Sequence, residues 1–294
     1  MTHYSIAGYS IEVSGNGLSA VPSFLPFIAP QNTDNEAPML RLQTGVAVDD
    51  PYIAPYCFYS FPCVEKDLNY SLAVKDYTWF MKIEKSGRTP FYIEIENRHG
   101  RCYAKTNMDE HTPAIIVCYA FLMAFGIVFV QYHTALIHAS VVTHKGKAII
   151  FLGDSGTGKS TQSRLWLEHI PYTELLNDDT PLIRVMNDCS VSVFGAPWSG
   201  KTPCYKNKSA PIAAFVQLSQ APHNQITQLK RTAGLGAVLH AIAKSLRLDE
   251  ALFEKITDIV SVIIEQIPVY RLECLPNAEA AYLVFNTLKE SGRL

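Results

Sequence analysis

Apolar and polar residues alternate along much of the first hundred residues, a pattern typical of strands that bury one face. The alternation is clearest in Tyr9 to Val13, Leu40 to Leu42 and Phe91 to Ile95. Two turn-forming sequences, Lys85 to Arg88 and Asn97 to Gly100, separate the later stretches. The pattern predicts a β-meander.

After Met108 the pattern changes to apolar helical stretches alternating with short strands, which indicates an α/β domain. The first two strands are expected to pair antiparallel across a turn at His144 to Gly146. The expected elements are strands 135–142, 147–152 and 269–274 and helices 160–169, 232–246, 248–266 and 277–290. We therefore predict a β-rich N-terminal domain over 1–108 and an α/β domain over 109–294.

The stretch from Thr112 to Tyr132 carries no charge. About 20 apolar residues are enough to cross a bilayer as a helix. However, the stretch lacks basic flanks, contains Gln131 and two tyrosines, and lies only a few residues before a strand of the α/β domain. We expect a buried core helix, with a helix that contacts a membrane as the alternative.

The composition is that of a globular protein. Of the 294 residues, 48% are hydrophobic and 18% are charged, and the formal net charge is −2. No basic run is long enough to follow a phosphate backbone, so we expect no nucleic-acid partner. The 7 cysteines contain no C-x-x-C pair, and the N-terminus has no secretory signal pattern. These features favour a cytoplasmic protein without a zinc site or a disulfide framework.

The sequence from Gly153 to Ser160 matches the phosphate-binding loop G-x-x-x-x-G-K-[ST], and it lies between a predicted strand and a predicted helix. Glycines let successive N–H groups point at phosphate oxygens, and the helix start adds its positive dipole end. Lys159 is expected to reach the β- and γ-phosphates of ATP, and the Ser160 hydroxyl to ligate Mg²⁺. The predicted nucleotide contacts are Gly153, Asp154, Ser155, Gly156, Thr157, Gly158, Lys159, Ser160 and Thr161.

Such a loop needs a second magnesium ligand, and the paired acids Asp178 and Asp179 follow an apolar stretch that suits this role. One acid would hold the metal while the other accepts a proton from an attacking hydroxyl. An Asx turn or a helix cap is the alternative.

Two further residues have open interpretations. His138 lies in an apolar strand before the loop, where a histidine is either a hydrogen-bonded core residue or a catalyst. Lys201, beside a glycine turn, is either a substrate-binding cation or a surface lysine.

Three motifs together carry a family resemblance. LIHAS, twelve intervening residues, GDSGTGKST and then NDD resemble the C-terminal catalytic domain of the bacterial HPr kinase/phosphorylases, which are P-loop proteins similar to phosphoenolpyruvate carboxykinase. The resemblance implies an α/β P-loop fold. It also implies a catalytic role for His138, roles for Lys159 and Ser160 in the loop, Asp178 as base and Asp179 beside the metal.

The resemblance covers about residues 130–220, and the chain departs from the family at one place. The kinase/phosphorylases carry a glutamate shortly after the paired acids, where this chain has Ser192 and Val193. No signature for docking the HPr protein is evident. The chain instead looks like an uncharacterised subgroup of relatives.

These observations predict an ATP- and Mg²⁺-dependent phosphotransferase that phosphorylates a hydroxyl of an unknown small molecule or protein. A non-catalytic ATP-binding module is the main alternative, and the missing glutamate favours it. A carboxykinase-type lyase is a weaker alternative. Members of the family often form oligomers, so a homo-oligomer stays open.

Overall fold

The computed structural model describes residues 1–19, 21–30, 37–49, 57–63, 67–200, 202–242, 246 and 249–294. The chain forms two compact units, Met1–Gln131 and Tyr132–Leu294. The sequence placed this boundary near residue 108, and the structure corrects it. The apolar helix that follows residue 108 belongs to the first unit, because its buried side chains are part of that unit's core.

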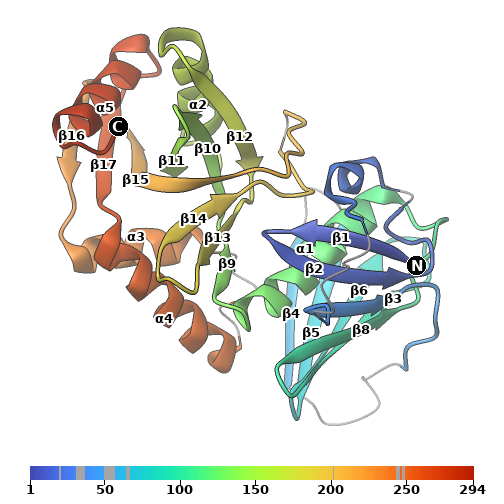
Figure 1. The fold of residues 1–294 in the computed structure, drawn as a ribbon. Helices are drawn as coiled ribbons and strands as arrows, with labels where there is room; N and C mark the ends of the chain where they lie inside the picture. Colours follow the sequence, from blue (N-terminus) through green and yellow to red (C-terminus); the bar gives the residue numbers. More distant parts are fainter. Residues whose placement is uncertain are drawn as a thin grey trace. The chain divides into compact units, whose positions relative to one another are not determined.

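The first unit is an eight-stranded sheet covered by one long helix (Figure 1). Its strands lie in the order β1-β2-β3-β8-β7-β6-β5-β4. The predicted meander is confirmed, because β5 to β8 pair antiparallel in chain order. The elements are β1 Thr2–Ile6, β2 Tyr9–Ser14, the 3-10 helix η1 Pro22–Phe27, β3 Leu40–Gln43, β4 Cys57–Cys63, β5 Leu68–Lys75, β6 Thr78–Lys85, β7 Phe91–Arg98, β8 Arg101–Thr106 and α1 Ala114–Val130.

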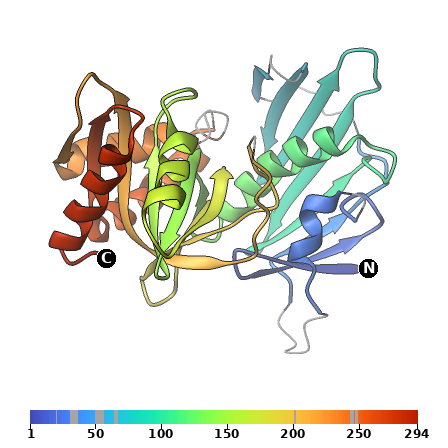
Figure 2. The same cartoon turned by 90° about the horizontal axis from the view of Figure 1, so that it is seen from above.

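Helix α1 packs on β6 and β7 (Figure 2). It buries Phe121, Phe125 and Phe129 in succession, with ring centroids 5.6 Å apart in each neighbouring pair. Spacings of four residues put these rings on one side of the helix. Every residue from Ala124 to Val130 is buried, which explains why this half of the helix carries no charge. Within the described residues, no helix has the length and apolarity that crossing a membrane would require.

The second unit is a mixed nine-stranded sheet with helices on both faces (Figure 1). Seven strands follow the order β12-β10-β11-β15-β14-β13-β9, and β17 extends from β15 with β16 beside it. The elements are β9 Thr134–Leu136, β10 Ala139–His144, β11 Lys147–Leu152, α2 Lys159–His169, β12 Thr173–Asp179, β13 Leu182–Val185, β14 Val191–Phe194, β15 Ser209–Gln220, β16 Gln225–Gln228, α3 Arg231–Ala241, α4 Glu250–Gln266, β17 Val269–Cys274 and α5 Ala278–Glu290.

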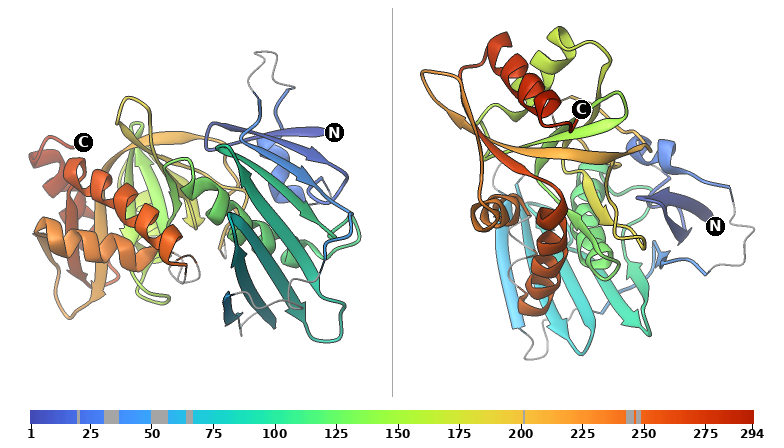
Figure 3. Two further views of the ribbon diagram at one scale, coloured as in Figure 1. Left: turned by 90° about the horizontal axis from the view of Figure 1, so that it is seen from below. Right: turned by 60° about the vertical axis from the view of Figure 1, so that its left-hand side comes forward.

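Strand β11 is buried on both faces, which explains its unbroken apolar sequence. On one face, Ile149 and Phe151 pack with Trp166 of α2 and with apolar residues of α5. Ile150 and Leu152 point the other way along the strand and are also buried, on the face where α3 contacts β11. Helices α3 and α4 run side by side (Figure 3).

The sequence expected one strand over 135–142, and the structure has two. Strand β9 pairs with β13, whereas β10 pairs with β11 and β12. The break falls at Ile137 and His138, where the His138 N–H donates to the Ala241 carbonyl at 2.7 Å. This long-range hydrogen bond redirects the chain from one part of the sheet to another. The helix expected over 232–246 also ends earlier, at Ala241.

Candidate functional site

The glycine-rich loop lies between β11 and α2, as the sequence predicts for this stretch. Gly158 is the N-cap of α2 with φ +109°, a conformation that side chains with a Cβ rarely adopt. The first-turn N–H groups of a helix have no intrahelical partner, and no side chain among the described residues caps them here. A helix start with free N–H groups and a positive dipole end is suited to an anion.

Lys159 is folded back against this loop. Its ammonium donates to the carbonyls of Gly153, at 2.8 Å, and Asp154, at 3.1 Å. It also lies 3.0 Å from His138 Nε2. Desolvation by burial lowers the pKa of Lys159, and the negative charges of Asp179, Asp154 and Asp178 partly counteract this effect. The lysine is therefore partly buried and within electrostatic reach of three carboxylates.

The paired acids reach the same edge of the sheet as the loop. Strand β10 lies between β11 and β12, and its first residue, Ala139, is opposite both Leu152 and Asp179. With about 4.8 Å between neighbouring strands, the end of β12 is about 10 Å from the start of the loop. Asp178 and Asp179 are the last two residues of β12, so they occupy neither a helix cap nor an isolated turn.

His138 bridges the space between Lys159 and the acids. Its Nδ1 is 3.6 Å from Asp179 Oδ1, while its Nε2 faces the lysine ammonium. A neutral imidazole that accepts from Lys159 at Nε2 carries its proton on Nδ1, toward the carboxylate. The structure thus brings His138, Lys159 and Asp179 together. Lys201 lies outside the described residues.

A buried amide holds the end of β12 in place. Asn177 is fully buried; its Nδ2 donates to the Trp198 carbonyl at 3.0 Å, and its Oδ1 accepts from the Asp179 N–H at 3.0 Å. The Trp198 indole N–H donates to the Thr180 carbonyl, and the Gly200 N–H donates to the Asp178 carbonyl at 3.1 Å. These hydrogen bonds hold the segment that follows β14, which contains Trp198 and Gly200, against the end of β12.

Sequence reasoning missed two residues that contact the loop. His240 of α3 has its Nε2 3.0 Å from Asp154 Oδ1, and Gln220 of β15 donates to the Gly156 carbonyl at 3.1 Å. These residues are 86 and 64 positions away from their partners in the chain. No local pattern in the sequence gives a sign of such contacts.

Among the described residues, no group of three or more His, Cys, Asp or Glu side chains is arranged to hold a metal ion. A magnesium ion in a phosphate-binding loop takes most of its ligands from water and phosphate, so it needs only one or two protein oxygens. The Ser160 hydroxyl at the start of α2 and the Asp179 carboxylate at the end of β12 are the residues that fit this role.

A cleft of about 550 Å³ opens beside the loop. One wall is the loop with the first turn of α2, and the other is formed by the segments after β15 and β17. Cys274 lines it, but burial raises the pKa of this thiol. A protonated thiol is a poor nucleophile, so the cleft is better suited to binding than to cysteine chemistry.

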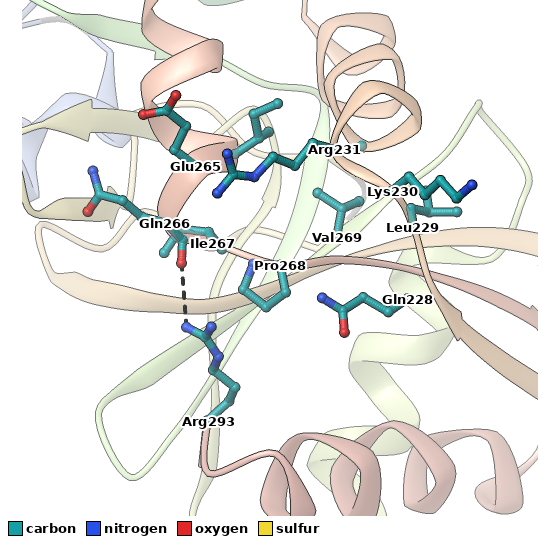
Figure 4. A pocket seen from close by; sticks show the side chains of 12 residues that line it. Gln228, Leu229, Lys230, Arg231, Glu265, Gln266, Ile267, Pro268, Val269 and Arg293 are labelled. Atoms are coloured by element: carbon teal, nitrogen blue, oxygen red, sulfur yellow. Dashed lines mark hydrogen bonds between the residues drawn. The ribbon is translucent and has the colours of Figure 1, made fainter.

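A smaller cavity, about 180 Å³, lies between the start of α3 and the end of α4 (Figure 4). Lys230, Arg231, Glu265 and Arg293 line it, and the Arg293 guanidinium donates to the Gln266 carbonyl at 3.5 Å. The cavity is near the start of β17, whereas the glycine-rich loop follows the end of β11. Parallel strands start and end at opposite edges, so this cavity is separate from the candidate site.

Comparison of this chain with protein-family models finds no match, and a search among curated proteins finds none.

Proposed function

We propose that this chain is an ATP- and Mg²⁺-dependent phosphotransferase that moves the γ-phosphoryl group of ATP to a hydroxyl of an acceptor. The observation that carries the proposal is the position of Lys159. It lies at the start of a helix, beside a glycine-rich loop, 3.0 Å from His138 and within electrostatic reach of Asp178 and Asp179. A cation next to free helix N–H groups and two carboxylates provides both phosphate binding and a base.

In the proposed reaction, the N–H groups of the loop and Lys159 hold the phosphate chain in line with the acceptor. Lys159 leaves the carbonyls of Gly153 and Asp154 and turns toward the phosphates. Asp178 accepts the proton of the acceptor hydroxyl as the oxygen-to-phosphorus bond forms. The bond to the β-phosphate oxygen breaks, and ADP leaves. Ser160 and Asp179 would hold a magnesium ion, which would neutralise negative charge on the phosphates.

His138 acts as a positioning residue in this proposal. Its Nε2 faces Lys159 and its Nδ1 faces Asp179, so it keeps a cation and a carboxylate in a fixed relation. Without the imidazole, we expect the lysine ammonium to approach Asp179 directly. That ion pair would withdraw both groups from the phosphates.

Binding of nucleotide is tested first. We expect titration calorimetry with Mg-ATP to show binding by the full chain and none by Lys159→Met, because the loop loses its only charged donor. Lys289→Ala, at an exposed position near the end of α5, is the control and should bind as the native chain does. Equal affinity of Lys159→Met and the native chain would refute the proposal.

Turnover is tested second, with γ-labelled ATP, Mg²⁺ and a panel of hydroxyl acceptors that includes serine, small hydroxy acids and cell lysate. Asp178→Asn is expected to lower transfer by about 10²- to 10⁴-fold, the range for a lost general base. Asp258→Asn, at an exposed position of α4, is the matched control. Transfer that survives Asp178→Asn would contradict the assignment of the base.

A non-catalytic ATP-binding module is the second candidate, and one observation favours it. Ser192 and Val193 in β14 stand where the family that the sequence resembles carries a glutamate. This candidate predicts that ATP raises the melting temperature through Lys159, without transfer to any acceptor. The two assays above therefore separate the candidates.

A further inference from the structure

The cleft beside the glycine-rich loop has the position and the chemistry of a nucleobase site. We infer that it holds the base and ribose of the bound nucleotide, and that Gln162 selects a base carrying an amino group. The inference rests on the proposed function, because the loop must hold the phosphates of the same molecule. Beyond the proposed function, it names the base as the part of the nucleotide that is recognised and identifies the residues that recognise it.

The topology brings three loops to one edge of the sheet. Strands β11, β15 and β17 are parallel neighbours, so the segments that follow them leave from the same edge. The first of these segments is the glycine-rich loop, and the other two contain Pro222 and Leu275. Ligands of open α/β sheets bind at the carboxyl ends of parallel strands, which is where this cleft lies.

The wall opposite the loop is apolar and preformed. Leu275 is 37% exposed, and it lines the cleft together with Pro222 and Pro276. Asn224 ties this wall together, because its Oδ1 accepts from the Leu275 N–H at 2.9 Å and its Nδ2 donates to Asn277 at 3.1 Å. A rigid apolar wall fits the flat face of a base, and binding there requires little ordering of the protein.

Gln162 provides the polar contact. Its side chain lines the cleft from the first turns of α2 and is 2% exposed. The Nε2 group donates to Cys274 Sγ at 3.5 Å, but Oε1 has no hydrogen-bond partner among the described residues. A buried acceptor without a partner is costly, so this oxygen calls for a donor. The exocyclic amino group of adenine is such a donor, on a molecule whose phosphates would reach the loop.

The alternative occupants of the cleft are less well matched. A purely apolar ligand would leave Gln162 Oε1 without a partner. An anion would meet an exposed leucine and two prolines on the far wall instead of cations. A base attached to a phosphate chain would contact Gln162 and the apolar wall, while its phosphates would contact the adjoining loop.

The test compares three ligands on the full chain by titration calorimetry in the presence of Mg²⁺: ATP, inorganic tripolyphosphate, and purine riboside triphosphate, which lacks the amino group. We expect ATP to bind at least about tenfold more tightly than tripolyphosphate, which corresponds to about 1.4 kcal/mol. We also expect ATP to bind more tightly than purine riboside triphosphate, and Gln162→Leu to abolish that difference.

A matched pair of variants tests the apolar wall. Leu275→Ser should weaken ATP binding by about three- to fivefold, from the lost apolar contact, and leave tripolyphosphate binding unchanged. Val262→Ser, at a 38% exposed position on α4, is the control and should change neither affinity.

The outcomes separate this inference from the proposed function. If tripolyphosphate binds and ATP binds no more tightly, the base site is refuted while the phosphate-binding loop survives. If Leu275→Ser weakens both ligands equally, the base site is likewise refuted. If neither ligand binds, the proposed function falls and the base site falls with it.

Discussion

Replacing Asn177 with alanine tests whether the end of β12 is held by one buried amide. The side chain is fully buried and makes hydrogen bonds of 3.0 Å to the Trp198 carbonyl and to the Asp179 N–H. Alanine removes both bonds and leaves the buried Trp198 carbonyl and the part-buried Asp179 N–H without these partners. Each such group costs about 1–3 kcal/mol, so we expect the free energy of unfolding of the second unit to fall by about 2–6 kcal/mol.

Urea unfolding of the full chain measures this loss. Because the chain has two compact units, two transitions are expected. The fluorescence of Trp166 and Trp198 reports on the second unit, and that of Trp79 reports on the first. Hydrogen exchange locates the effect, since the Asp179 and Gly200 N–H groups should lose protection. Mg-ATP binding should also weaken, because Asp179 is then less firmly held.

Asn286→Ala, at an exposed position of α5, is the control and should change stability by less than about 0.5 kcal/mol. An Asn177→Ala protein that loses less than about 0.5 kcal/mol, with Asp179 still protected, would show that the amide does not position the acids.

Three further predictions concern the second unit. Gly158→Ala forces a Cβ into a φ of +109° and should cost about 1–2 kcal/mol in thermal unfolding while weakening Mg-ATP binding. Burial lowers the pKa of His144 below 6.5, so the folded state favours the neutral ring. The free energy of unfolding should therefore fall as the pH drops below 6.5 toward the pKa of the folded state. Urea titrations at several pH values measure this dependence, and His144→Asn should remove it. Trp166→Ala should cost about 3–5 kcal/mol in urea unfolding. Trp166→Phe should cost much less, because it keeps an aromatic ring beside Phe151 and Phe285 and the indole N–H that it removes has no partner among the described residues. A Phe variant as unstable as the Ala variant would contradict this.

Periodicity was sufficient for the local elements. Alternation predicted the strands around Ile11 and Ile93, and the motif from Gly153 to Ser160 placed the loop between β11 and α2. Both features depend on neighbouring residues in the sequence. Strands are recognised because side-chain direction repeats every two residues, and the loop is recognised because its backbone conformations need the freedom of glycine.

Periodicity was not sufficient where a long-range contact changed the backbone. The stretch 135–142 is mostly apolar and contains neither glycine nor proline to indicate a break, but the structure divides it into β9 and β10, where the His138 N–H donates to the Ala241 carbonyl. For the same reason the domain boundary was misplaced at 108. An uncharged helix can cover either neighbouring sheet, and only packing assigns α1 to the first unit.

The sequence by itself singled out the residues of the proposed site: the loop with Lys159, the acids Asp178 and Asp179, and His138. Only the tertiary structure decided that these groups meet at one edge of a sheet, with β10 between the loop and the acids. It also decided that Gln162 and Leu275 share a cleft. The physical reason is that strand order and register bring together residues that are distant in the chain, more than a hundred positions apart for Gln162 and Leu275, and no local pattern of side chains encodes that pairing.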